Sequence, residues 1–158
     1  MSNWTVYFSA GLGSMLAITV LALIGQNEQE HLLLMAAFGA SCVLIFVLPE
    51  SPLAQARNVI AGHCITALVG VIFVELVPLN AFSLGCATGL AVGLMMFTKT
   101  VHPPAGANPV FIMLTGQGWI FLLFPVLTGA ICLVLIGRAY HLIRTHALYK
   151  NKKVDHSV

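Results

Sequence analysis

The sequence predicts an all-α polytopic membrane protein, a compact bundle of about six membrane segments. Of its 158 residues, 59% are hydrophobic and only 8% are charged, and the mean hydropathy is +0.96. Soluble domains do not have such values. Several apolar stretches are long enough to cross a hydrocarbon core of about 30 Å, which takes roughly 20 helical residues. We therefore expect the lipid bilayer as its surroundings, and no nucleic-acid partner.

The apolar stretches cover residues 6–24, 31–48, 59–77, 81–98 and 118–137, with a shorter one at 109–115. Polar or proline-bearing breaks separate them, since proline and glycine interrupt helices. No Lys or Arg precedes the first stretch, which argues against a removable signal peptide. We expect one membrane domain over residues 1–137, followed by a basic cytoplasmic tail over residues 138–158.

The basic residues indicate the orientation, because short cytoplasmic loops collect Lys and Arg. Arg57 lies in the second connection, Lys99 in the fourth, and five more basic residues follow the last span. The other connections carry none. Six crossings with both termini in the cytoplasm place every basic residue inside. If residues 103–115 instead enter and return on one side, there are five crossings.

Residues 103–115 are too few to cross as a helix, since thirteen helical residues reach only about 20 Å. We predict that the proline-rich part is extended, so that six extended and seven helical residues together reach about 30 Å. Extended backbone is not tolerated against lipid. This segment must then be buried in protein or line a hydrated path, where we expect the function.

Glycine recurs at every fourth position in one span, at Gly85, Gly89 and Gly93. This spacing places the three glycines on one helical face, where another backbone can approach closely. Packing within the chain is the first interpretation, and a subunit interface is the second. We expect a homo-oligomer, since so small a bundle has little interior for a pathway.

The two proline-bearing segments hold the residues that could bind a small anion. Ser51-Pro52 and Asn108-Pro109 suit the cap and first position of new helices, whose free N–H groups attract anions. Cationic and hydrogen-bonding side chains lie close by in the sequence. The candidate pathway residues are Ser41, Arg57, Asn58, Thr98, Lys99, Thr100, His102, Pro103, Pro104 and Asn108.

Several of these residues have a structural interpretation as well. Arg57 could pair with Glu50 or mark the headgroup level, and Lys99 could extend to the interface. His102 could brace the bend or could titrate and couple protons to anion movement. Glu75 is an interfacial acid or a second proton relay.

The remaining chemistry-bearing residues predict no catalytic or metal site. We interpret His63 as a packed polar residue, and the histidines of the tail have no metal-site spacing. The four cysteines lie far apart inside apolar stretches and are expected to pack. Without a nucleophile-and-base pair or a metal cluster, we expect no enzyme activity, no metal and no cofactor.

The string His102-Pro103-Pro104-Ala105-Gly106-Ala107, after Met95 and Met96, resembles the signature of the HPP family. The earlier runs Phe38-Gly39-Ala40-Ser41 and Pro49-Glu50-Ser51-Pro52-Leu53-Ala54-Gln55 are similar to it too, although Ala56 stands where the family commonly has proline. The resemblance implies a compact domain of four to six helices, with residues 103–115 as the short segment broken by the motif. Chloroplast and cyanobacterial relatives are associated with nitrite transport.

Together, the residues and the resemblance predict a transporter or channel for a small inorganic anion, with nitrite as the expected substrate. We expect it in the plasma membrane, the inner membrane of a bacterium. The alternative is a non-transporting membrane assembly subunit, for which the glycine face would suffice.

Overall fold

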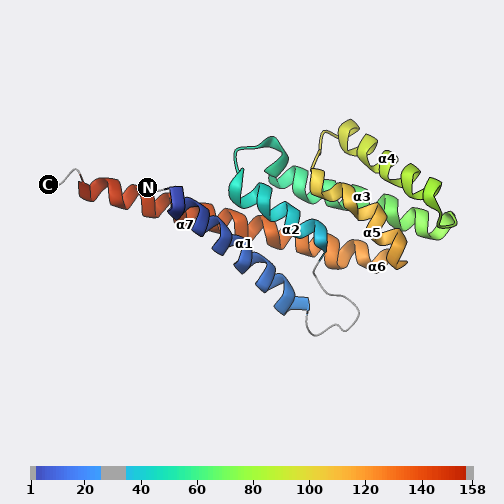
Figure 1. Cartoon of the computed structure of the whole chain (residues 1–158), viewed down its shortest axis with the longest axis horizontal. Helices are drawn as coiled ribbons and strands as arrows, with labels where there is room; N and C mark the ends of the chain where they lie inside the picture. The colour runs from blue at the N-terminus through green and yellow to red at the C-terminus, as the bar shows by residue number, and fades with distance from the viewer. Residues whose placement is uncertain (1–2, 26–34, 156–158) are drawn as a thin grey trace.

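The computed structural model describes residues 3–25 and 35–155, and over these residues the chain is helical, without a strand (Figure 1). The elements are α1 (Asn3–Gly25), α2 (Ala36–Cys42), the π-helical η1 (Val43–Val47), the 3-10 helix η2 (Pro52–Ala54), α3 (Ala56–Leu76), α4 (Ala81–Phe97), the 3-10 helix η3 (Pro103–Ala107), α5 (Asn108–Thr115), α6 (Trp119–Phe121), the π-helical η4 (Leu122–Leu127) and α7 (Thr128–Asp155). The predicted all-α membrane fold is confirmed.

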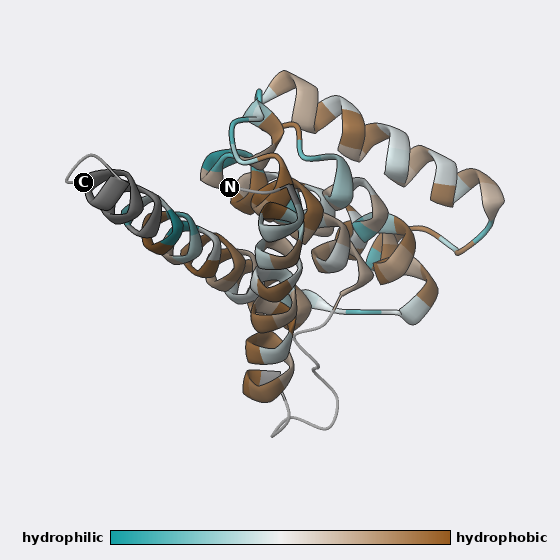
Figure 2. Ribbon diagram, turned by 60° about the vertical axis from the view of Figure 1, so that its left-hand side comes forward, coloured by the Kyte–Doolittle hydropathy of each residue, from teal (hydrophilic) through white to brown (hydrophobic). Residues whose placement is uncertain are grey.

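Three helical stretches in the described part are long and apolar enough to cross a membrane: Trp4–Ile24, Ala56–Leu76 and Trp119–His146. The helices Ala36–Val47 and Ala81–Phe97 are apolar but shorter. Figure 2 shows hydrophobic residues along most of the helical surface, while hydrophilic residues gather at connections and toward the end of α7. A lipid-facing exterior of this kind suits a bundle whose solvent is hydrocarbon.

The break predicted between the third and fourth apolar stretches is present, and it is a sharp turn. Asn80 caps α4, since its side-chain oxygen accepts from the Ser83 backbone N–H at 2.9 Å and the Ser83 hydroxyl accepts from the Asn80 N–H at 2.9 Å. This reciprocal pair satisfies two of the donors that a helix start leaves open. The chain therefore reverses sharply, and α4 runs back beside α3 (Figure 1).

Two hydrogen bonds show which connections share one end of the bundle. Arg57 Nη2 donates to the Thr98 carbonyl at 3.1 Å, and His141 Nε2 lies 2.8 Å from the Ile45 carbonyl. The connections after α2 and α4 and the later part of α7 therefore meet at one end, called the basic end here because Arg57, Lys99 and Arg138 lie there. The predicted grouping of these basic residues is present. The polar break predicted between the first and second apolar stretches lies in residues 26–34, outside the described residues.

Helix α3 lies at the centre and contacts α4, η3, α5, η4 and α7. Two of its glycines permit close backbone approach. An added Cβ at Gly62 would lie 2.9 Å from His102 Cβ, and one at Gly70 would lie 3.0 Å from Pro109 Cα. The chain from His102 to Ile112 therefore runs alongside α3 in the same direction.

The prediction that the proline-rich part is extended was wrong. Pro103–Ala107 forms a 3-10 helix, begun by the Ala105 N–H bond to the His102 carbonyl at 3.0 Å. Proline fixes φ near the helical value, which favours this turn. Five 3-10 residues and eight α-helical residues reach roughly 22 Å, so the segment is shorter than expected. His102 before it is extended, with φ −137° and ψ 98°.

The last described part of the chain forms one long helix. Helix α7 continues without a break from Thr128 to Asp155. The predicted boundary at residue 137 therefore falls inside a helix, and the division into a membrane domain and a basic tail stays a prediction.

The glycine face of α4, defined by Gly85, Gly89 and Gly93, has no packing partner among the described residues. All three glycines are exposed, and an added Cβ at any of them would have no described neighbour within 4 Å. The first interpretation of this spacing was wrong, because α4 turns its other face, with Ala87 and Ala91, toward the core.

Candidate functional site

Five polar side chains are buried together in the centre of the apolar bundle. Their exposed fractions are 0% for four of them and 1% for Asn108. We call them the histidine cluster; its members are Ser41, His63, Thr66, His102 and Asn108. Burying a polar group costs free energy unless it is hydrogen-bonded, and polar residues at membrane depth are candidates for function.

Four parts of the chain bring the cluster together. Ser41 comes from α2, His63 and Thr66 from α3, and Asn108 from the first residue of α5. His102 lies in the connection between α4 and η3, where its extended backbone follows the close approach to Gly62. The HPP string thus delivers an imidazole to the bundle interior.

The Ser41 hydroxyl bridges the two imidazoles. Its Oγ lies 3.0 Å from His63 Nε2 and 2.8 Å from His102 Nε2. The rings have centroids 5.1 Å apart. At the far side of His102, Nδ1 lies 2.8 Å from the Leu53 carbonyl.

Asn108 holds the other side of His63. Its Nδ2 lies 3.0 Å from His63 Nδ1, 3.2 Å from the His63 carbonyl and 2.9 Å from Thr66 Oγ1. Because the His63 carbonyl can only accept, the amide nitrogen rather than the amide oxygen must face it, and the same nitrogen then faces His63 Nδ1. The predicted capping role of Asn108 was wrong: its side chain caps nothing, because the helical turn already begins at Pro103 and the Asn108 N–H bonds the Ala105 carbonyl.

These partners assign the hydrogens along the cluster. The Leu53 carbonyl only accepts, so His102 Nδ1 carries a hydrogen; Asn108 donates, so His63 Nδ1 is bare. With both rings neutral, His63 Nε2–H donates to Ser41 Oγ, and the Ser41 hydroxyl donates to His102 Nε2. The cluster is therefore one directed chain of hydrogen bonds, from Asn108 to Leu53.

The predicted residues nearer the basic end brace the connection before η3. Besides the Arg57 bond to Thr98, Asn58 Nδ2 donates to the Val101 carbonyl at 2.9 Å. The hydroxyls of Thr98 and Thr100 lie 2.7 Å apart. Arg57 makes no ion pair with Glu50 in the described part of the chain. Its partner there is the backbone of the segment that carries His102.

Other predicted residues lie away from the cluster. Lys99 is exposed at the basic end with a left-handed backbone (φ 55°), Pro103 is exposed, and Pro104 is half-buried. Glu75 is exposed twelve residues beyond His63 on α3, about 18 Å along the helix. Glu75 is thus too distant to exchange a proton directly with His102.

His63 and Thr66 were missed as site residues. A signal was present in the sequence: Asn58, Gly62, Thr66 and Gly70 recur every fourth residue on α3. In the structure this face follows the segment from Val101 to Ile112. A stripe of small and polar residues in an apolar helix marks the side that meets another backbone.

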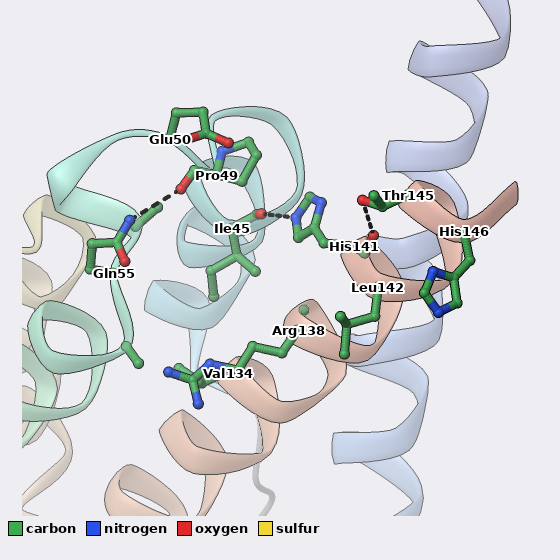
Figure 3. A pocket seen from close by; sticks show the side chains of 13 residues that line it. Ile45, Pro49, Glu50, Gln55, Val134, Arg138, His141, Leu142, Thr145 and His146 are labelled. Atoms are coloured by element: carbon green, nitrogen blue, oxygen red, sulfur yellow. Dashed lines mark hydrogen bonds between the residues drawn. The ribbon is translucent and has the colours of Figure 1, made fainter. Parts of the chain in front are cut away.

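A cavity of about 610 Å³ opens at the basic end, between the connection after α2 and the later part of α7 (Figure 3). Its lining residues are Ile45, Pro49, Glu50, Ala54, Gln55, Ala56, Val134, Gly137, Arg138, His141, Leu142, Thr145 and His146. Ile45 lies one turn from Ser41 on the same helix, and Ala54 follows Leu53. The cavity therefore ends close to the cluster.

Comparison with known proteins supplies the family. The family model described as the HPP transmembrane region matches residues 1–150. The chain belongs to the HPP transmembrane family. The expected resemblance is confirmed, and the histidine of the HPP string is the one buried in the cluster.

Two relatives of the HPP chain are transmembrane proteins of Dictyostelium discoideum. One is 42% identical over 135 residues, which are 78% of this chain and 47% of the relative. The other is 39% identical over 135 residues, 78% of this chain and 43% of the relative. The chain thus spans less than half the length of either. No solved structure matches it.

The described residues contain no group of three His, Cys, Asp or Glu side chains placed to hold a metal ion. The side chains of the cluster offer hydrogen bonding and, at the imidazoles, proton binding.

Proposed function

We propose that this HPP protein carries a small inorganic anion, such as nitrite, across the membrane by way of the histidine cluster. The observation that carries the proposal is the burial of two imidazoles, two hydroxyls and an amide together in a membrane bundle. Such groups are expensive to keep in an apolar interior and are found there where solutes or protons pass.

The polarity of the cluster favours an anion over a cation. Ser41, His63 and Asn108 can each present an O–H or N–H hydrogen, and no carboxylate is among the hydrogen-bond partners of the cluster in the described residues. The nearby cavity adds the positive charge of Arg138, with Glu50 at its rim as the opposing charge (Figure 3). We propose that an anion gathers in this cavity, whose lining residue Ile45 lies one helical turn from Ser41, before it enters the cluster.

The basic end supports an orientation. Arg57, Lys99 and Arg138 together favour the cytoplasmic side, by the rule that short internal connections collect positive charge. We propose that both termini lie on that side of a plasma membrane, the inner membrane in a bacterium. We propose no enzymatic activity.

The second candidate is a membrane assembly subunit that transports nothing. The exposed glycine face of α4 favours it, because glycine faces of this spacing associate with other helices in membranes. The same face would serve a transporting homo-oligomer, so only transport separates the two candidates.

Flux into liposomes tests the proposal. Purified protein is reconstituted and the uptake of nitrite, nitrate, formate and chloride is measured against protein-free liposomes. We expect saturable uptake of at least one anion, lowered in Ser41→Ala and unchanged in Thr115→Ala, whose hydroxyl donates to the Phe111 carbonyl of its own helix. Folded protein without uptake of any of the four would reject the transporter and leave the assembly subunit.

A further inference from the structure

The two histidines of the cluster have different surroundings at the nitrogen that would accept another proton. For His63 that nitrogen is Nδ1, which faces Asn108 Nδ2 at 3.0 Å. For His102 it is Nε2, which faces the Ser41 hydroxyl at 2.8 Å. An amide nitrogen cannot accept a hydrogen bond from the newly protonated ring nitrogen, whereas a hydroxyl oxygen can.

A proton on His63 Nδ1 would point one N–H at another. Rotating the Asn108 amide to offer its oxygen would relieve that contact, but would bring the oxygen against the His63 carbonyl at about the same place. Two acceptors would then face each other without a hydrogen between them. His63 is therefore held neutral as a donor toward Ser41.

A proton on His102 Nε2 would face the Ser41 hydroxyl, whose hydrogen can rotate to another acceptor. Ser41 Oγ also lies 3.0 Å from the Ala37 carbonyl. When the hydroxyl hydrogen rotates to that carbonyl, Oγ accepts from His63 Nε2–H and His102 Nε2–H at the same time, using both lone pairs. His102 Nδ1–H keeps the Leu53 carbonyl. Every hydrogen bond of the charged form is satisfied without moving a heavy atom.

We propose that His102 is the binding site for one proton that travels with the anion, that Ser41 is the hydroxyl switch which accommodates it, and that His63 stays neutral. The proposal rests on the proposed function of the same site. Binding is the addition of one proton to His102 Nε2, and release is its loss to water.

The surroundings of His102 explain why proton and anion would move together. His63 is the ionisable side chain in contact with the His102 ring. Arg57 and Lys99 are exposed at the basic end, and Glu50 is exposed in the connection that contains Leu53. Cys42 is buried and follows Ser41 in the sequence. None supplies a negative charge beside the ring. A buried cation without a counter-charge is costly, and so is a buried anion. Each ion therefore lowers the cost of the other, and the pair crosses without net charge.

Nitrogen NMR of protein labelled in its histidines tests the assignment. Signals are assigned with His63→Gln and His102→Gln, and the pH is lowered from 8 in bilayers, with sodium nitrite or without it. We expect His102 to become charged while His63 keeps one bare nitrogen, and more charged His102 at a given pH with nitrite. A charged His63, or a neutral His102 until the protein unfolds, would overturn the proposal.

Transport supplies the second readout. Flux of the wild type should fall up to about tenfold for each pH unit above the range in which His102 is charged, as one bound proton requires. His102→Gln should flatten this profile, whereas His63→Gln should keep its slope at a lower rate. Equal slopes in wild type and His102→Gln would overturn the proton role. Absent flux beside the expected NMR result would reject the proposed function alone.

Discussion

Helices α3 and α4 each have a face on which small residues recur every fourth residue, Gly62, Thr66 and Gly70 on α3 and three glycines on α4, and the two faces have opposite surroundings. On α3, Gly62 and Gly70 lie against the backbone of the segment that holds His102 and Asn108. On α4, the glycine face meets nothing within the described chain. The same spacing therefore serves an internal contact that positions the histidine cluster in one helix, and leaves a surface open to lipid or another chain in the other.

The largest effect on flux and stability is expected at Gly62 of α3, where an added side chain has no space. In Gly62→Ala the new methyl group would lie 2.9 Å from His102 Cβ and 3.0 Å from the Thr100 carbonyl, and backbone cannot easily retreat. Overpacking of this kind costs about 1–3 kcal/mol. We expect a clear fall in the unfolding temperature and loss of flux. The matched variant Gly85→Ala, which meets open space, should leave both unchanged; equal losses in the two would refute the comparison.

A smaller effect on flux, at a similar cost in stability, is expected inside the cluster. Ser41→Ala leaves His63 Nε2–H without its acceptor, a cost of about 1–3 kcal/mol for an unpaired buried group. We expect reduced thermal stability and a flux without pH dependence. Ser41→Thr keeps the hydroxyl and should retain that dependence. A full pH profile in Ser41→Ala would show that the hydroxyl plays no part.

The open face of α4 should affect assembly rather than folding. Gly89→Leu places a bulky side chain where another helix would approach, so we expect fewer oligomers at unchanged unfolding temperature. Native mass spectrometry in mild detergent measures this. Wild-type protein that is monomeric under those conditions would count against a homo-oligomer.

The smallest effect is expected at the exposed end of α3. Arg57→Gln removes one exposed charge and its bond to the Thr98 carbonyl, and exposed charges contribute up to about 1 kcal/mol. The anion concentration for half-maximal flux should rise by no more than about fivefold. Lys99→Gln, which removes an exposed charge at the same end, is the companion variant. A complete loss of flux in Arg57→Gln would move the binding site outward, toward the basic end.

Much of the site could be foreseen because its residues stand out against an apolar chain. Ser41, His102 and Asn108 were predicted from their place in proline-bearing segments, and all three are in the cluster. Arg57, Asn58 and Thr98 were predicted as anion ligands, but here they hydrogen-bond within the protein. A sequence shows that a donor is present and does not show which acceptor lies nearest.

By itself, the sequence determined the class of this protein, the places where its helices break and the end where its charges gather. These follow from hydropathy, proline and charge, which act locally along the chain. Only the tertiary structure decided that His63 joins His102 through Ser41, that Asn108 turns inward, and that the glycines of α4 face outward. Each depends on which faces of neighbouring helices meet. Periodicity defines a face, and only packing in three dimensions selects its partner.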